Sequence, residues 1–326
     1  MPVQELIELR AKVISSAIRK FKPDVLIVDH LPRGACHELD RTLERLQRHG
    51  ETRCVLGLRD VLQDPATVES TWSCQDNLAL RAYYDAIWIY GDPTVFDPLH
   101  EYNIFDGAAS KVHYTGYLDQ RPRLGFADAE TNQLLGNLPP GRLVVCLVGG
   151  GHDGAALVEA FAQAELPPAT TGVIVAGPYM PARTRQRLCQ SAQPRPGLRV
   201  LEFVPEPGPL IQQAERVIAM GGYNTMCEVL SFEKHALIVP RVHPKPEQWI
   251  RAERMRQLGL IEVLHPDKLS SRAISHWLAR DLGPPPPSRR LIDFGGLERI
   301  PDLAADLLRA SPGPPPQAVP VGVGQS

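Results

Sequence analysis

The stretch Leu143-Val-Val-Cys-Leu-Val-Gly-Gly-Gly-His-Asp-Gly-Ala-Ala-Leu157 passes from a continuous apolar run into a glycine-rich turn and then into a segment with helical spacing. An apolar run without alternation is typical of a parallel strand that is covered on both faces. Glycines let the backbone approach an anion, and a helix that begins directly after them offers free N–H groups. The stretch therefore predicts one strand–turn–helix unit of a parallel sheet.

Short apolar runs of the same kind recur along the chain and alternate with helical stretches. The runs are 25–29, 54–58, 86–90, 112–115, 143–148, 172–176, 198–203, 216–220 and 236–240. Between them, apolar residues recur at the three- and four-residue spacing of a helix that buries one face, as in 6–21. This alternation predicts an α/β fold made of two Rossmann-like, doubly wound parallel-sheet domains.

Changes in composition predict where these domains begin and end. We expect an N-terminal domain over 1–118, a polar and turn-rich linker over 119–141, and a C-terminal domain over 142–283. A proline run then begins a C-terminal extension with one helix over 284–310, and the Pro- and Gly-rich tail 311–326 is expected to be disordered. The N-terminal half opens with a helix that no strand precedes, so its sheet is either reduced or lacks its first strand–helix units.

The overall composition excludes several classes of protein. The 326 residues carry a formal net charge of −2, whereas a nucleic-acid binder usually has a strong positive excess. The six cysteines form no CxxC pair, which argues against a zinc ribbon or a redox dithiol and fits reduced thiols in the cytosol. No apolar run reaches the roughly 18 residues of a membrane helix, and the N-terminus does not resemble a signal peptide. We therefore expect a cytoplasmic protein with no metal site and no nucleic-acid partner.

In the first glycine-rich turn, Gly149, Gly151 and Gly154 satisfy the pattern G-x-G-x-x-G. A dinucleotide site also needs an acidic residue at the end of the second strand, but that strand ends in Val175-Ala-Gly-Pro178. The turn has no GK[ST] sequence either, so it is not a P-loop. Two interpretations remain, which are an anion or diphosphate site and a plain tight turn.

A second glycine turn, Met220-Gly-Gly-Tyr-Asn-Thr-Met-Cys-Glu228, also follows a strand and opens a helix. Thr225 and Glu228 have the spacing of a capping box, in which both side chains satisfy N–H groups of their own helix. Alternatively, Glu228 lies near the carboxyl edge of the sheet, where it accepts hydrogen bonds from two hydroxyls of a bound ribose. The pattern alone does not decide between these two roles.

A third polar element follows the strand that ends at Val239 and Pro240. A proline-rich loop leads there into an amphipathic helix whose first turns carry Glu247, Gln248 and Arg251. These side chains would again meet a ligand at the carboxyl edge of the sheet. The alternative is a solvated first turn, in which the acid simply suits the positive end of the helix dipole.

These three elements in this order resemble the C-terminal domain of GT-B glycosyltransferases of the family 28, MurG-like type, and most closely its bacterial "predicted glycosyltransferase" branch. The residues that carry the resemblance lie within 143–260 and are Gly149-Gly-Gly151, Glu202-Phe-Val204, Gly221-Gly-Tyr-Asn-Thr-Met-Cys-Glu228, and Glu247-Gln248 with Arg251-Ala252. A weaker N-terminal match covers Lys22–Asp29 and Tyr114–Tyr117. Family members carry further strand–helix units at the front, which this chain looks to lack.

The resemblance implies a role for each element of a donor site. The glycines that would cradle the diphosphate are Gly149, Gly150, Gly151 and Gly154. Phe203 and Val204 would line the base pocket. The residues expected near the phosphates are Gly222, Asn224 and Thr225. Glu228 would hold the ribose hydroxyls, and Glu247 with Gln248 would bind the transferred sugar.

The resemblance implies an inverting transfer of a hexose-type sugar from a nucleotide sugar, with UDP as the expected nucleotide, to an unknown acceptor. No cofactor or metal is expected, because the nucleotide sugar is a substrate and the helix dipole behind the glycine turn can stabilise the leaving diphosphate. The candidates for the base that deprotonates the acceptor stand at the ends of N-terminal strands and are Asp29, His30 and Asp60.

Two other functions stay open at this point. The chain could be a non-catalytic nucleotide-sugar-binding subunit whose front half is supplied by another chain, or a UDP-sugar 2-epimerase, which shares the fold. The N-terminal domain would face the acceptor in a transferase. The sequence leaves open a peripheral contact with the inner face of a membrane, and it does not indicate the oligomeric state.

Overall fold

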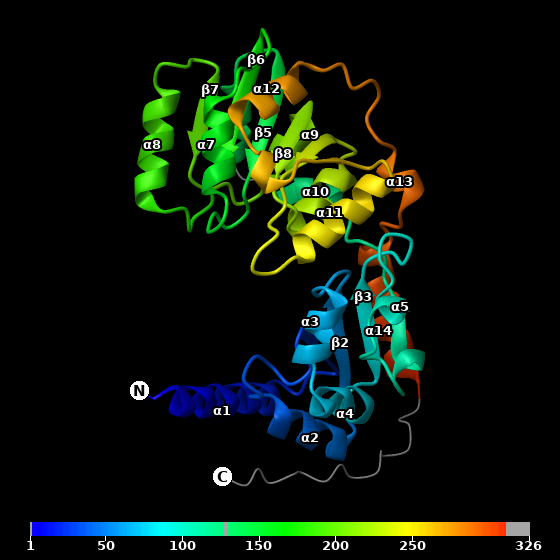
Figure 1. Ribbon diagram of the computed structural model, residues 1–326. Coiled ribbons are helices and arrows are strands. Elements are labelled where there is room, and N and C mark those ends of the chain that lie inside the picture. Colours follow the sequence, from blue (N-terminus) through cyan, green and yellow to red (C-terminus); the bar gives the residue numbers. More distant parts are fainter. Residues whose placement is uncertain (1, 127–128, 311–326) are drawn as a thin grey trace. The chain divides into compact units, whose positions relative to one another are not determined.

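The computed structural model describes residues 2–126 and 129–310, which divide into two compact units (Figure 1). One unit combines Met1–Tyr117 with Gly295–Ser326, and the other is Leu118–Phe294. Each unit is built around one parallel sheet, as the alternation of strands and helices predicts. The expected disordered tail 311–326 lies outside the described residues. No described helix has both the length and the apolar character that crossing a membrane requires.

The N-terminal unit contains four parallel strands in the order β1-β2-β3-β4. Their bounds are Val25–Asp29 for β1, Arg53–Arg59 for β2, Ala86–Tyr90 for β3 and Val112–Tyr114 for β4. The helices of this unit are α1 (Val3–Phe21), α2 (Asp40–His49), α3 (Pro65–Thr71), α4 (Cys74–Tyr83), α5 (Pro98–Glu101), the 3-10 helix η1 (Ala109–Lys111) and α14 (Gly296–Arg309). Because the strand order follows the chain order, this sheet winds in one direction only.

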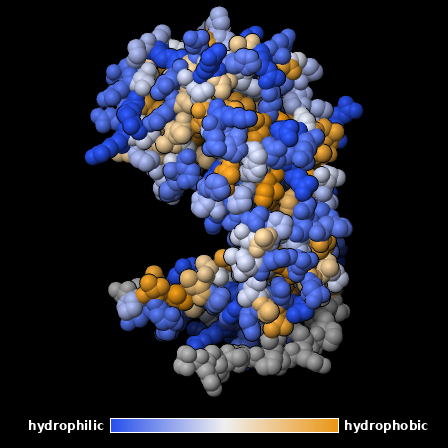
Figure 2. All heavy atoms as spheres, in the orientation of Figure 1, coloured by the Kyte–Doolittle hydropathy of each residue, from blue (hydrophilic) through white to orange (hydrophobic). Residues whose placement is uncertain are grey.

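One side of this unit presents apolar surface to solvent. β1 is an outer strand whose pairing partner among the described residues is β2, and Ile27 on it is 47% exposed. Figure 2 shows apolar side chains along the exposed surface of α1. None of the residues of α1 is buried, and the exposed apolar residues on it are Val3, Leu6, Leu9, Val13 and Phe21.

The last described helix, α14, returns to the N-terminal sheet. Ile300, Leu303 and Leu307 on one face of α14 pack against the buried cluster around Trp88. The expected single extension over 284–310 is therefore divided between the units. Its first part, α13 (Ser288–Leu291), stays with the other unit, where the Ser288 hydroxyl donates to the carbonyl of Leu230 at 2.5 Å. The apolar face of α14 has to be buried against another element, and the sheet of the N-terminal unit provides that surface.

The C-terminal unit holds six parallel strands in the order β10-β9-β8-β5-β6-β7. The strands are β5 (Arg142–Leu147), β6 (Thr170–Val175), β7 (Leu198–Leu201), β8 (Arg216–Ala219), β9 (His235–Ile238) and β10 (Glu262–Val263). The main helices are α7 (Ala155–Gln163), α8 (Ala182–Ala192), α9 (Gly208–Gln213), α10 (Tyr223–Ser231), α11 (Glu247–Gln257) and α12 (Ser271–Ala279). The shorter ones are the 3-10 helices η2 (Arg121–Phe126) and η3 (Pro266–Lys268), and α6 (Ala129–Gly136).

The segment 119–141, which we expected to be a linker, belongs to this C-terminal unit. It contains η2 and α6, and its contacts hold it to the unit. The backbone N–H of Gln120 donates to the Ser231 hydroxyl at 3.0 Å, and Asp119 forms an ion pair with Arg289 at 2.9 Å. The described residues of this segment therefore lead into β5 as a part of the C-terminal unit.

The direction of winding reverses within the C-terminal sheet. β5 pairs with β6 on one side and with β8 on the other, so Cys146 lies opposite both Ile174 and Ile218. The chain proceeds outward from β5 through β6 to β7 and then returns to β8. Ligands of open α/β sheets bind at the carboxyl ends of the strands, at such a reversal point. The expected doubly wound sheet is confirmed here, and its reversal point locates the candidate site.

The packing of α14 predicts unequal effects of two neighbouring substitutions. Leu303→Ala removes a partly buried side chain that contacts the Trp88 cluster, and should lower the free energy of unfolding of the N-terminal unit by about 1–2 kcal/mol. Leu308→Ala is the matched control, because Leu308 is 49% exposed. Urea titration followed by tryptophan fluorescence measures both. Equal effects of the two substitutions would contradict the packing of α14 on this sheet.

Candidate functional site

The first glycine turn joins β5 to α7, and Gly154 occupies the N-cap position of α7. Gly149 and Gly151 have φ values of 56° and 90°, in the left-handed region that favours glycine. A Cβ on Gly151 would lie 2.4 Å from the carbonyl oxygen of Ala176, and one on Gly154 would lie 2.3 Å from Cβ of Val148. Backbone geometry therefore requires these glycines whether or not a ligand binds.

A cavity of about 220 Å³ lies at the carboxyl ends of β5 and β8, at the reversal point of the sheet. Its lining residues are Val148, Gly149, Gly150, Gly151, His152, Asp153, Met220, Gly222, Thr225, Arg241 and Gln248. The three motifs of the sequence analysis thus meet around one cavity. A plain tight turn explains the glycine geometry, but it does not explain why the other two motifs converge on the same space.

Of the other residues expected at the phosphates, Gly222 lines the cavity, whereas Asn224 and Gly154 are not among its lining residues. Gly222 is the N-cap residue of α10, and a Cβ built on it would meet no atom within 4 Å. Asn224 is exposed on the first turn of the same helix. Gly154 lies at the start of α7, where its missing side chain allows contact with Val148. The first turns of α7 and α10 thus both begin beside the cavity.

The capping box, one of the two interpretations of Thr225 and Glu228, is not formed at α10. Gly222 takes the N-cap position with φ −63° and ψ 143° and makes no side-chain cap bond, so Thr225 is already the third residue of the helix. Glu228 lies a turn further on, too far along the helix to bond the N-cap backbone. The capping interpretation of Glu228 was therefore wrong.

Glu228 is partly buried, and its surroundings disfavour the charged form. Burial, together with the negative charge of Glu206, raises the pKa of Glu228 to about 7, although the charge of Arg123 acts in the opposite direction. Among the described residues, no group donates a hydrogen bond to the Glu228 carboxylate. A partly buried acid with a raised pKa and no hydrogen-bond donor among the described residues is a typical candidate for ligand binding.

Glu206, which no sequence pattern indicated, is 6% exposed and lies close enough to Glu228 for its charge to raise the pKa of that acid. Its carboxylate accepts from Nε of Arg123 at 2.7 Å and from the backbone N–H of Gly208 at 3.3 Å. The sequence Pro205-Glu206-Pro207 directly follows Val204. A buried acid at this position was not indicated by any local pattern, because its partner Arg123 comes from the segment that we expected to be a linker.

Phe203 and Val204 follow β7 and line a second cavity of about 220 Å³. Val204 is buried, whereas Phe203 is 57% exposed and free to contact a ligand. Thr131 and Gln133 of α6 line the same cavity, so the misassigned linker contributes to this part of the site as well. None of these residues lines the glycine cavity, and the two cavities lie at the carboxyl ends of different strands.

The third motif is organised by Arg241, a residue to which the sequence analysis gave no role. Its guanidinium donates to Asp153 of the glycine turn at 2.8 Å and to Glu247, the first residue of α11. Its backbone N–H donates to Oε1 of Gln248 at 3.1 Å. Arg251 is 1% exposed and donates to the carbonyl of Gly221 at 3.1 Å, and this buried hydrogen bond stabilises the backbone of the second glycine turn.

The three candidates for a catalytic base differ in accessibility. Asp60 has 0% exposure, and its carboxylate accepts from the Tyr117 hydroxyl and the Val61 backbone N–H, both at 2.7 Å. These bonds give Asp60 a structural role in the N-terminal unit, which does not suit a base. Asp29 is exposed at the end of β1. His30 follows it with a φ of 70°, a strained conformation that is often found at functional sites.

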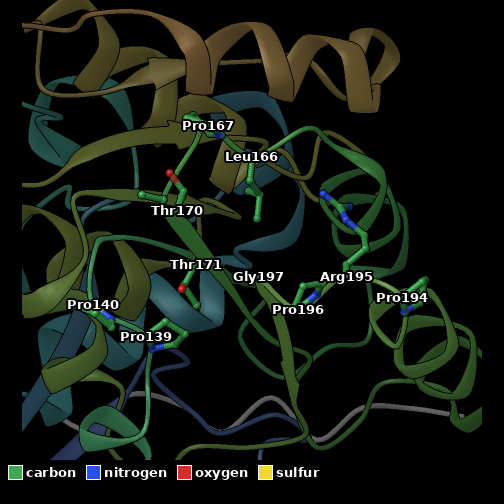
Figure 3. Close-up of a pocket in the computed structure, with 11 residues that line it drawn as sticks. Pro139, Pro140, Leu166, Pro167, Thr170, Thr171, Pro194, Arg195, Pro196 and Gly197 are labelled. Carbon is green, nitrogen blue, oxygen red and sulfur yellow. The ribbon is translucent and has the colours of Figure 1, made fainter.

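Two further features of the described residues, the lack of a metal-binding cluster and a cavity at the opposite edge of the sheet, indicate no other ligand site. No group of three or more His, Cys, Asp or Glu side chains that could hold a metal ion occurs among them. A cavity of about 520 Å³ lies at the amino ends of β5 and β6, the edge opposite to the ligand-binding edge (Figure 3). Prolines dominate its lining, and its Arg195 is engaged by the carbonyl of Ala164 at 2.6 Å.

Comparison with known proteins relates the C-terminal unit to glycosyltransferases. Residues 144–282 match the family model of the Glycosyltransferase family 28 C-terminal domain. An uncharacterized glycosyltransferase of Methanopyrus kandleri is 31% identical over 99 residues. The match covers 30% of this chain and 28% of that protein, so the chain spans less than a third of the curated relative that it matches.

Solved structures resemble nearly the whole chain. The calicheamicin glycosyltransferase CalG4 matches 91% of this chain and 78% of its own, with 15% identity and a TM-score of 0.61. A putative UDP-N-acetylglucosamine 2-epimerase from Listeria monocytogenes matches 96% of this chain and 82% of its own, with 10% identity and a TM-score of 0.63. At this level of identity the likeness shows the fold, which is the GT-B arrangement of two Rossmann-like sheets.

The environment of Glu228 predicts how its substitution changes stability with pH. Since folding raises the pKa of Glu228 from 4.5 to about 7, the folded state favours the protonated acid, and this stabilisation is lost as the pH rises from 4.5 through 7. Glu228→Gln stays neutral at every pH. It should therefore raise the melting temperature at pH 8 and change it little at pH 5.

Differential scanning calorimetry at the two pH values measures this effect. The control is Glu165→Gln, because Glu165 is an exposed acid of the same unit. A loss of stability in Glu228→Gln at pH 8 would mean that the carboxylate does stabilise the fold in its charged form.

Proposed function

We propose, since residues 144–282 match the family model of the Glycosyltransferase family 28 C-terminal domain, that the protein transfers a hexose-type sugar from a UDP sugar to an acceptor hydroxyl. The observation that carries the proposal is the cavity at the reversal point of the sheet, which two glycine turns and the first turn of α11 enclose. The unused Glu228 carboxylate on α10 adds a group suited to ribose.

The diphosphate suits the glycine cavity. Helix N-termini carry free N–H groups and a partial positive charge, and α7 and α10 both begin at this cavity. Gly149, Gly150 and Gly151 leave the loop backbone open to phosphate oxygens. Because the N-termini of α7 and α10 supply positive charge at the phosphate position, a transfer without a metal ion is the mechanism that we propose.

The ribose and the base would extend from this cavity toward β7. An ionised Glu228 can accept hydrogen bonds from both ribose hydroxyls, since a carboxylate has two acceptor oxygens. The base would enter the cavity beside Phe203 and Val204. At the other end, Glu247 and Gln248 would bind the sugar, because they open α11 next to the phosphate site.

The reaction would be a direct displacement at the anomeric carbon. The acceptor hydroxyl oxygen attacks this carbon, a base removes the hydroxyl proton, and the bond between the carbon and the β-phosphate oxygen breaks with inversion. UDP leaves with the bonding electrons, and the helix N-termini stabilise its charge. Asp29 and His30 are the candidates for the base in the N-terminal unit.

A second candidate function is 2-epimerisation of a UDP sugar. It is kept because 2-epimerases match this chain as well as transferases do, with TM-scores of 0.63 and 0.61 for one structure of each kind. Incubating the protein with UDP-N-acetylglucosamine separates the proposals. Transfer or hydrolysis releases UDP, whereas epimerisation yields a second UDP sugar without releasing it. A protein that binds UDP and turns over neither would be a nucleotide-sugar-binding subunit.

The proposal predicts that UDP binding depends on the ionisation of Glu228. With a pKa of about 7, the ionised fraction rises about tenfold between pH 6 and pH 8, so the affinity of the wild type for UDP should rise by a similar factor. Glu228→Gln should weaken binding at pH 8 by about 1.5–3 kcal/mol and flatten this dependence. Isothermal titration calorimetry measures both. Equal affinities of the two proteins at pH 8 would refute the ribose assignment.

Gly222 offers a test that separates binding from folding. A methyl group at Gly222 meets no protein atom within 4 Å, and its φ of −63° is allowed to alanine. Gly222→Ala should therefore cost less than about 1 kcal/mol of stability, yet lower UDP affinity because the methyl group occupies the phosphate cavity. Gly154→Ala is the contrast, since it clashes with Val148 and should lower the melting temperature. Unchanged UDP binding in Gly222→Ala would argue against phosphate at this turn.

A further inference from the structure

Arg241 connects the glycine turn to the first turn of α11. Its side chain, 22% exposed, forms ion pairs with Asp153 of the turn and with Glu247 of the helix. Its Nε donates to the carbonyl of Lys245 at 3.4 Å. Asp153 and Glu247 are far apart in the sequence, so the Arg241 guanidinium joins two elements that the chain does not connect locally.

The same contacts fix the polar groups at the start of α11. Oε1 of Glu247 accepts from Arg241, while Oε2 is buried and has no hydrogen-bond partner among the described residues. Oε1 of Gln248 accepts from the backbone N–H of Arg241. The two side chains are thus oriented by Arg241, with one carboxylate oxygen and the amide NH₂ left for other partners.

Arg241 also lies between two neighbouring cavities. A cavity of about 410 Å³ adjoins the glycine cavity, and Asp153, Met220 and Arg241 line both. The ion pair between Arg241 and Asp153 therefore stands between the two spaces. If this ion pair were broken, the glycine cavity would open into the larger cavity. A diphosphate sugar in the glycine cavity would then lose contact with one side of its site.

The charge balance at this place restricts the ligand. Two carboxylates surround one guanidinium, so the sugar end of the site has an excess of negative charge. Burial alone would lower the pKa of Arg241, but the hydrogen bond to Asp153 and the charge of Glu247 outweigh it and raise that pKa. The guanidinium stays charged, and a carboxylate on the ligand would be repelled by Glu247 and Asp153.

We propose that Arg241 is a positioning residue of the donor site, which holds the glycine turn and the first turn of α11 together, and that the two carboxylates it holds there, Asp153 and Glu247, favour a neutral sugar over a sugar acid. This inference rests on the proposed binding of a UDP sugar. It concerns the sugar end of the ligand, whereas Glu228 and the glycine turns concern the nucleotide end. The two can therefore fail separately.

The test measures dissociation constants of UDP, UDP-glucose, UDP-N-acetylglucosamine and UDP-glucuronate by calorimetry. For the wild type we expect at least one neutral UDP sugar to bind about tenfold more tightly than UDP, and UDP-glucuronate to bind no more tightly than UDP. In Arg241→Gln the gain from the neutral sugar should disappear, while the affinity for UDP stays within about threefold. Arg241→Lys should restore only part of the gain, because an ammonium group cannot bridge both carboxylates in the same way.

Two controls separate positioning from folding. Arg256→Gln breaks the 2.9 Å ion pair between Arg256 and Glu253, both of which lie in α11. This substitution should leave every dissociation constant unchanged. Asp153→Asn should weaken binding of the neutral sugar in the wild type but add nothing in the Arg241→Gln background, since Asp153 acts through Arg241.

The outcomes that overturn the inference are distinct. An equal loss of UDP and UDP-sugar affinity in Arg241→Gln would mean that the residue only supports the fold. A wild type that binds UDP-glucuronate as tightly as the neutral sugars, or that gains nothing from a neutral sugar, would refute the selection of a neutral sugar. If the wild type does not bind UDP at all, the proposed function itself fails, and this inference falls with it.

Discussion

The candidate site depends on the reversal of winding in the C-terminal sheet. β5 lies between β6 and β8, and the helices that follow β5 and β8 leave the sheet in different directions. α7 packs with α8 and α12 over the face that contains Cys146 and Ile218. The space between the diverging turns cannot be filled by the connecting chain, so it becomes a cavity bounded by helix N-termini. Every residue assigned to phosphate or sugar binding is placed by this one property of the strand order.

Much of this arrangement could be predicted because it depends on local patterns. The continuous apolar runs correspond to strands at nearly every position, since a strand covered on both faces must be apolar along its length. The glycine turns were also predictable, because Gly149 and Gly151 have backbone angles that disfavour other residues. Local pattern did mislead at α10. The spacing of Thr225 and Glu228 suits a capping box, but the helix begins earlier, at Gly222, and leaves Glu228 in its second turn.

The features that escaped prediction are contacts between distant parts of the chain. Arg241 meets Asp153 across 88 positions, and Arg123 meets Glu206 across 83. Neither pairing has a sequence signature, because salt bridges depend on where the sheet places its loops. The return of α14 to the N-terminal sheet is of the same kind, since its apolar face shows that the helix is buried but not against which sheet. At Glu228, too, the perturbing group, Glu206, comes from another loop.

The outer strand of the N-terminal unit has a consequence for handling the protein. Among residues 2–126 and 129–310, β1 pairs only with β2, so its other side forms the edge of the described sheet, with Ile27 exposed and the exposed apolar residues of α1 in the same unit. Such an edge is a template on which another chain can add a strand, and apolar neighbours make the addition more favourable. We therefore expect additives that shield apolar surface to reduce association of the protein in solution through this edge.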